Sequence, residues 1–120
     1  MSNNEDILRI ETTDPRMAQC VVHNGTVYIS GQVDTEGTDV ESQTQTILAK
    51  IDSILAKAGT NKSKLLSAQI WLKDIESGFQ PMNSVWAQWL DPQNKPVRAT
   101  VEAKLALPQL LVEIQVTAAL

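Results

Sequence analysis

The dipeptide Asn24-Gly25 separates two apolar stretches and restricts how this part of the chain can fold. Asparagine and glycine both tolerate positive φ angles, which a two-residue type I′ turn requires. The flanking stretches, Ala18–Val22 and Thr26–Gln32, are therefore predicted to pair as a hairpin. The second strand ends at Ser30-Gly31-Gln32, where a glycine allows another group to approach the backbone closely.

Two amphipathic segments follow the hairpin and predict helices. The first helix ends at Gly59, a residue suited to the left-handed conformation of a helix C-terminus. The second is predicted from about Phe79, because Pro81 is compatible only with a first helical turn. We interpret the apolar residues of both helices as core, and they are Val40, Ile47, Leu48, Ile51, Ile54, Leu55 and Ala58 in the first and Phe79, Met82, Val85, Trp86, Trp89 and Leu90 in the second.

The remaining apolar segments predict strands. Residues 67–73, 97–105 and 112–118 alternate polar and apolar side chains, and Ile7–Ile10 is a short run suited to an edge strand. A long helix between strands implies a crossover, so part of the sheet is expected to be parallel. The order predicts a single α+β domain, residues 1–120, in which two helices cover one face of a mixed β-sheet.

The sheet face away from the helices is expected to be polar. We place Arg98, Thr100, Glu102, Glu113 and Gln115 on it, with Trp71 as a further candidate. Such a mixed face can be buried by self-association, and symmetric closure would put its polar groups in clefts between subunits. The pattern therefore motivates the hypothesis of a homo-oligomer.

Composition narrows the classes of function. The formal net charge of −4 and the scattered basic residues argue against a nucleic-acid partner. His23 and Cys20 are the only residues of their kinds, so a metal site built from histidine and cysteine is not expected, and the Cys20 thiol is interpreted as structural. No stretch is long and apolar enough to suggest a membrane span, and the polar N-terminus favours a cytoplasmic location.

Arg98 and Glu113 are the candidate catalytic pair. If their strands are neighbours, both side chains can emerge on one face of the sheet. A guanidinium can clamp a carboxylate with two parallel hydrogen bonds, and a carboxylate nearby can hold or deprotonate a water molecule. The alternative is an ordinary cross-strand ion pair on an exposed sheet, worth under about 1 kcal/mol, and spacing alone favours that alternative.

Several stretches of the chain resemble the Rid (YjgF) family over nearly its whole length. They include Val27–Gln32 after the hairpin turn, Phe79 and Met82–Trp86 on the second predicted helix, and the run Pro96–Val101. Leu107-Pro108 and Val112-Glu113-Ile114 then complete the most specific part of the pattern.

The resemblance implies a chorismate-mutase-like fold in a homotrimer, with the sheets closed into a barrel and the active sites between subunits. It implies hydrolysis of reactive 2-imino acids, or their 2-enamino tautomers, to 2-keto acids and ammonia without a metal or organic cofactor. Arg98 would then bind the substrate carboxylate and Glu113 would position or activate water. The pocket residues implied in the same way are Ser30, Gly31, Asn83, Ala99 and Thr100.

Two departures from the family pattern bear on the substrate range. Many deaminating members carry a tyrosine about where Met17 stands, so Met17 is included among the pocket residues, and many carry a cysteine in place of Thr100. A non-enzymatic trimer that binds or senses a small carboxylate, such as a 2-keto acid, is the alternative function. A chaperone-like or ribonuclease-like role is a third, which the acidic charge balance disfavours.

Overall fold

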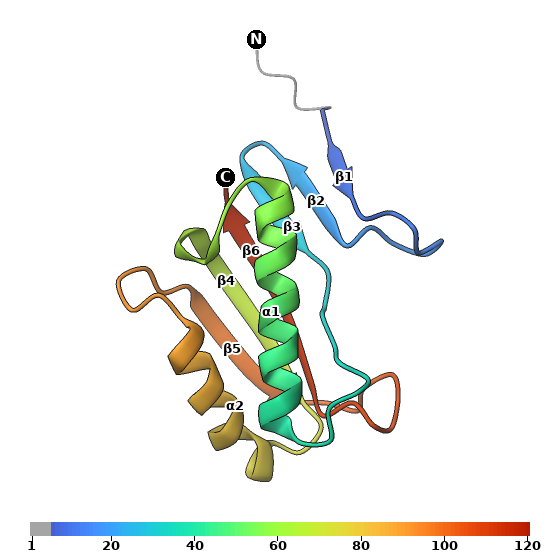
Figure 1. Ribbon diagram of the computed structural model, residues 1–120, viewed down its shortest axis with the longest axis vertical. Helices are drawn as coiled ribbons and strands as arrows, with labels where there is room; N and C mark the ends of the chain where they lie inside the picture. Colours follow the sequence, from blue (N-terminus) through green and yellow to red (C-terminus); the bar gives the residue numbers. More distant parts are fainter. Residues whose placement is uncertain (1–5) are drawn as a thin grey trace.

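The computed structural model describes residues 6–120, so most of the polar N-terminal segment lies outside the described residues. One mixed sheet of six strands carries two helices on one face (Figure 1). The strands are β1 (Leu8–Ile10), β2 (Cys20–His23), β3 (Thr26–Ile29), β4 (Leu65–Leu72), β5 (Val97–Glu102) and β6 (Val112–Ala119), and the helices are α1 (Val40–Ala58) and α2 (Ile75–Trp89), with a short 3₁₀ turn at Lys62–Lys64. The predicted α+β architecture is confirmed.

The order of strands across the sheet is β1-β2-β3-β6-β4-β5. β4 and β5 are parallel, as the crossover through α2 requires, and the other pairs are antiparallel. β5 is therefore an edge strand, and β4 lies between it and β6.

The predicted hairpin is confirmed, with Asn24 at φ 52° and Gly25 at φ 77°. Its second strand is shorter than expected and ends at Ile29. The chain then returns to the sheet through a bridge between Gln32 and Ile114. Ser30 and Gly31 thus lie in an interruption of the strand rather than inside it.

Helix α1 is closed at both ends and fixed to the core by a buried amide. Asp39 caps its N-terminus by accepting a hydrogen bond from the backbone N–H of Ser42, and Gly59 ends it at φ 89°. The fully buried Gln43 side chain donates to the carbonyls of Gly37 and Gln109 and accepts from the N–H of Leu111. Gln43 therefore fixes the loop that precedes α1 and the loop that precedes β6 to this helix.

The predicted start of the second helix is wrong. Helix α2 begins at Ile75, capped by Asp74, so Pro81 lies in its interior. Gly78, which precedes the predicted start, is buried within the helix, and its N–H donates to the Asp74 carbonyl. The carboxylate of Glu102 accepts a hydrogen bond from the N–H of Ile75 and so stabilises this early start from another strand, which local sequence does not reveal.

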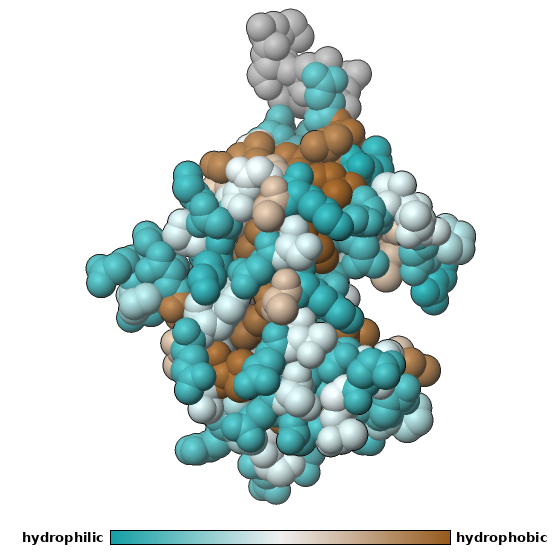
Figure 2. Space-filling view, viewed as in Figure 1, coloured by the Kyte–Doolittle hydropathy of each residue, from teal (hydrophilic) through white to brown (hydrophobic). Residues whose placement is uncertain are grey.

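The core lies between the two helices and the sheet face that they cover. On β4 this face carries the buried side chains of Ala68, Ile70 and Leu72. Figure 2, drawn from the helix side, shows mostly hydrophilic residues over α1, with hydrophobic surface between the two helices and near the β2–β3 hairpin. The opposite face of the sheet carries no helix (Figure 1).

Candidate functional site

Arg98 lies on the helix-covered face of β5, not on the open face that we expected. Its register partner on β4 is the buried Ala68, and paired residues project to the same side of a sheet. The same register places Thr100 beside Ile70 and Glu102 beside Leu72. Alternation correctly grouped these three polar residues, but the pairing with β4 decides which face they occupy.

The Arg98 guanidinium lies over the indole ring of Trp86 on α2, with 5.5 Å between Cζ and the ring centroid. Among residues 6–120 it forms no hydrogen bond or ion pair with a carboxylate. Burial lowers the pKa of Arg98, although an arginine side chain stays protonated in proteins. A half-buried cation without an anionic partner is costly unless a ligand supplies one.

Thr100 lies one residue pair further along the same face as Arg98. Its Oγ1 atom is buried and has no hydrogen-bond partner within the described residues, the single such side-chain atom found there. Asn83, half-buried on α2, precedes Trp86 by three residues and so shares its side of the helix. Ala99 is different, because its pairing with Gln69 places it on the open face.

Glu113 lies on the open face of the sheet, opposite Trp71 of β4. Its carboxylate packs against Gly31, where a Cβ atom would come within 2.0 Å of Oε2. Among the described residues no hydrogen bond or ion pair reaches this carboxylate. Burial raises the pKa of Glu113, because the ionised form loses solvation without gaining a partner.

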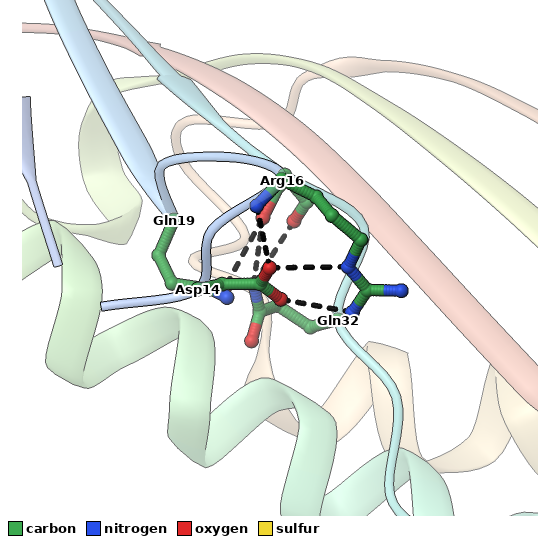
Figure 3. A network of polar contacts seen from close by, with 5 residues as sticks. Asp14, Arg16, Gln19 and Gln32 are labelled. Carbon is green, nitrogen blue, oxygen red and sulfur yellow. Dashed lines mark hydrogen bonds and ion pairs between the residues drawn. The ribbon is translucent and has the colours of Figure 1, made fainter. Parts of the chain in front are cut away.

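A network of amides holds the Gly31 segment in place. The Oε1 atom of Gln19 accepts hydrogen bonds from Ser30 Oγ at 3.0 Å and from Gln32 Nε2 at 2.8 Å. Figure 3 shows Gln19 and Gln32 near the Asp14–Arg16 ion pair of the loop that precedes β2. The Ser30 hydroxyl proton is thus used inside the protein, and this network was not predicted from the sequence.

Arg98 and Glu113 do not meet within one protomer. They lie on opposite faces of the sheet. Their strands, β5 and β6, are separated by β4 and are therefore not the neighbours that the predicted pair required. Two strand spacings and a register offset of three residues place their Cα atoms roughly 14 Å apart. The alternative of a cross-strand ion pair between them is thereby excluded.

Met17 lies far from Arg98 along the sheet. It is 45% exposed in the loop before β2, and three strands separate β2 from β5. Within one protomer the predicted site residues therefore form two groups. Arg98, Thr100 and Asn83 belong to the β5–α2 side, and Glu113, Gly31 and Ser30 belong to the segment between β3 and β6.

A cavity of about 330 Å³ lies at the end of β5 that contains Arg98. Apolar side chains are exposed along the same strand, since Val97, which lines the cavity, is 73% exposed and Val101 is 45% exposed. On an edge strand such residues favour a protein contact. The cavity is lined by Ser67, Ala68, Gln69, Val97, Arg98, Ala99, Gln115, Val116 and Thr117.

Trp86 is the residue whose second role sequence reasoning missed. Its helical spacing correctly predicted a core position, and it is 6% exposed. The spacing did not indicate that its ring would also support the guanidinium. The available signal was the pair Asn83 and Trp86, which places a polar and an aromatic side chain on the same side of α2.

Residues 6–120 contain neither a metal-binding cluster nor a membrane-spanning helix. No cluster of three or more histidine, cysteine, aspartate or glutamate side chains is arranged to hold a metal ion there. In the same range no helix has the length and apolar character needed to cross a membrane.

Comparison with known proteins identifies the family. The family model described as Endoribonuclease L-PSP matches residues 10–120. A RutC family protein of Haemophilus ducreyi is 43% identical over 115 residues, covering 95% of this chain and 97% of that protein. The RutC family protein YoaB of Escherichia coli is 41% identical over 113 residues, covering 94% of this chain and 97% of that protein.

Solved structures agree with the sequence comparison. A YjgF family member from Neisseria meningitidis is 40% identical and superposes with a TM-score of 0.93, covering 98% of this chain and 97% of the other. A Rid family protein from Yersinia pestis is 31% identical with a TM-score of 0.87, covering 96% of this chain and 100% of the other. On both sequence and fold, the chain belongs to the YjgF/RutC (Rid) family.

Proposed function

We propose that this protein hydrolyses 2-imino acids, or their 2-enamino tautomers, to 2-keto acids and ammonia in sites between the subunits of a homotrimer. One observation carries the proposal: Arg98 and Glu113 are both half-buried, and within the described residues neither has a polar partner. Buried polar side chains that serve only a structural role normally have a hydrogen-bond partner. Two unpaired opposite charges support a site whose remaining parts are a ligand and a second subunit.

Arg98 is assigned to the substrate carboxylate. Its ring contact with Trp86 leaves the N–H groups of the guanidinium available for two parallel hydrogen bonds. The unpartnered Thr100 hydroxyl lies on the same face and is assigned to the same ligand. Asn83 is assigned to the edge of this pocket, and a small 2-imino acid supplies both the anion and the polar atoms that these groups lack.

Glu113 is assigned to the hydrolytic water. The Glu113 carboxylate takes a proton from water while the water oxygen bonds to the C2 carbon of the imine. The C=N electron pair moves to nitrogen, which is protonated. Collapse of the resulting carbinolamine forms the C=O bond and releases ammonia, so one water is consumed for each keto acid formed. The raised pKa of Glu113 suits this role, because a base works best when its pKa is near the working pH.

The separation of the two charges supports a site that is shared between subunits. Arg98 lies at the edge strand of the sheet and Glu113 on the open face, so a complete site needs the Arg98 edge of one subunit against the Glu113 face of another. The exposed Val97 and Val101 side chains supply apolar surface for this contact. Closed rotational symmetry would repeat the same contact three times.

The activity test compares wild type with Arg98→Ala, using 2-iminopropanoate generated by an amino-acid oxidase and measuring ammonia and pyruvate release. We expect Arg98→Ala to lower kcat/KM by about 100-fold or more, since it removes a charge-assisted bidentate contact. Arg16→Ala is the control, because Arg16 is exposed and pairs with Asp14 in a surface loop. Equal rates for wild type and Arg98→Ala would refute the assignment.

A mixed-oligomer experiment tests the shared site. Arg98→Ala and Glu113→Gln chains are co-expressed in equal amounts, each alone being inactive. If every site takes Arg98 from one subunit and Glu113 from another, random assembly restores about a quarter of the wild-type activity. Recovery of no activity in demonstrably mixed trimers would contradict the proposal, as would a monomer mass by light scattering.

The same measurements separate the alternative functions. Saturable pyruvate binding without turnover of any imine would favour a carboxylate-binding trimer over an enzyme. The family model carries an endoribonuclease description, but the formal net charge of −4 disfavours contact with a phosphate backbone. We therefore expect no salt-dependent binding of single-stranded RNA, and affinity that falls steeply with added salt would favour the ribonuclease function instead.

A further inference from the structure

We propose that Trp86 is a positioning residue for Arg98, whose guanidinium it holds by the face of its indole ring so that the N–H groups point to the substrate carboxylate. The inference rests on the proposed function, because it assumes that Arg98 binds an anion. It adds a role for an aromatic side chain that would otherwise count as core.

The contact has the geometry of a cation–π interaction. The Cζ atom of Arg98 lies 5.5 Å from the Trp86 ring centroid, within the usual limit of about 6 Å. Trp86 is only 6% exposed, so the attraction acts where water screens it weakly. Tryptophan is also the aromatic residue that binds a cation most strongly.

A ring is a better support than an acidic side chain for an arginine that must bind an anion. A carboxylate partner would occupy the fork of the guanidinium, which is the part that recognises a substrate carboxylate. An aromatic ring contacts the flat face of the guanidinium and leaves the N–H edge unused. This explains how Arg98 can be half-buried and held in place without an acidic partner among the described residues.

Two contacts join α2 to β5. At one end of the strand, the Glu102 carboxylate accepts a hydrogen bond from the N–H of Ile75, the first residue of α2. At the other end, Arg98 lies over Trp86. From Ile75 to Trp86 the helix advances by eleven residue steps, or about 16 Å. From Glu102 to Arg98 the strand advances by four residue steps, or about 13 Å, so the two contacts are compatible with α2 lying along β5.

Trp89 provides a matched comparison on the same helix. Its ring centroid lies 5.4 Å from that of Trp86, and its Nε1 atom donates to Asp52 of α1. The cation near the Trp89 ring is Lys62, which is not among the proposed site residues. Loss of Trp89 therefore removes a large aromatic side chain and its packing without removing the support of Arg98.

The test measures binding of pyruvate and of its neutral analogue pyruvamide by calorimetry, for wild type, Trp86→Phe, Trp86→Leu and Trp89→Leu. We expect Trp86→Leu to weaken pyruvate binding about tenfold, in keeping with a cation–π contact shielded from water. Trp86→Phe keeps an aromatic face and should lose about threefold. Pyruvamide binding should change by less than twofold in every variant, since it carries no anion for Arg98, and Trp89→Leu should bind pyruvate within about twofold of wild type.

Each other outcome identifies which statement fails. Equal pyruvate affinity in wild type and Trp86→Leu would overturn the inference about Trp86. If Arg98→Ala still lost pyruvate binding, the proposed role of Arg98 would stand. A matching loss of pyruvate and pyruvamide binding in Trp86→Leu would show a general structural role and would also overturn it. Equal pyruvate affinity in wild type and Arg98→Ala, or no binding to wild type, would instead overturn the assigned role of Arg98.

Discussion

Gly31→Ala is expected to reduce activity strongly while leaving the stability of the fold nearly unchanged. A Cβ atom at residue 31 would lie 2.0 Å from Oε2, 3.0 Å from Cδ and 3.2 Å from Cγ of Glu113. An ordinary carbon–oxygen contact is longer by about 1 Å or more, so the Glu113 carboxylate must move by at least that distance. A displacement of about 1 Å in a catalytic group can cost about 100-fold in rate.

The effect of Gly31→Ala on stability has two opposing parts. Gly31 is not among the positive-φ glycines, so alanine can adopt its backbone conformation and should gain about 0.4–1 kcal/mol by restricting the unfolded chain. Rotation of the Glu113 side chain away from the new methyl group should cost about 0.5–1.5 kcal/mol. The two contributions nearly cancel, and we expect the free energy of unfolding to change by less than about 1 kcal/mol.

The experiment measures kcat/KM for 2-iminopropanoate and the free energy of unfolding in urea on the same preparations. Gly78→Ala is the matched control, because Gly78 lies inside helix α2 and its added methyl group would meet the side chains of Leu72 and Val40 at an ordinary 3.6 Å. That control should keep wild-type activity and gain up to about 1 kcal/mol of stability from helix propensity. Wild-type activity in Gly31→Ala would refute the reasoning that the observed position of Glu113 matters.

Three further substitutions test individual groups. Because burial raises the pKa of Glu113, wild type should lose stability as pH rises from the ordinary glutamate pKa of about 4.3 through the raised pKa. In urea titrations Glu113→Gln should therefore gain stability relative to wild type over that range and keep the gain at higher pH, and the acid limb of wild-type kcat/KM should lie above about pH 4.3. A stability difference that is independent of pH would contradict this assignment. Thr100→Val removes a buried hydroxyl that has no hydrogen-bond partner among the described residues. We expect the substitution to raise the free energy of unfolding by about 1 kcal/mol and to weaken pyruvate binding. A less stable variant would show that the hydroxyl forms a hydrogen bond in solution. Gln43→Leu leaves three backbone groups without a hydrogen-bond partner and should lower the free energy of unfolding, measured by chemical denaturation, by about 3 kcal/mol or more. The control is Gln45→Leu on the exposed side of α1, which should change that free energy by less than about 0.5 kcal/mol.

The proposed site shows why unpaired charges are informative in a small protein. Arg98 and Glu113 both lose solvation on folding, and the pKa of each shifts in the direction that burial alone produces. Neither gains a compensating partner among residues 6–120. Burial without a partner is expected to lower stability, which is the pattern of residues kept for binding or catalysis.

Local sequence was sufficient to predict the elements that are specified by residues close together in the chain. Asn24-Gly25 specifies the hairpin turn because both residues tolerate positive φ, and Gly59 ends α1 for the same reason. The apolar spacing of α1 and the alternation along β6 predicted their buried apolar residues, since side-chain direction repeats every 3.6 residues in a helix and every two in a strand. The start of α2 was predicted wrongly because one of the groups that stabilise it, the Glu102 carboxylate that accepts a hydrogen bond from the N–H of Ile75, comes from a later strand.

The sequence by itself also determined that Arg98, Thr100 and Glu102 share one side of their strand, because alternation is a local property of an extended chain. Only the tertiary structure decided that this side faces the helices, since the face depends on the pairing of β5 with β4. The insertion of β4 between β5 and β6 likewise depends on the parallel crossover through α2, which no local pattern encodes. For that reason Arg98 and Glu113, fifteen residues apart in sequence, lie on opposite faces of the sheet in the folded protomer.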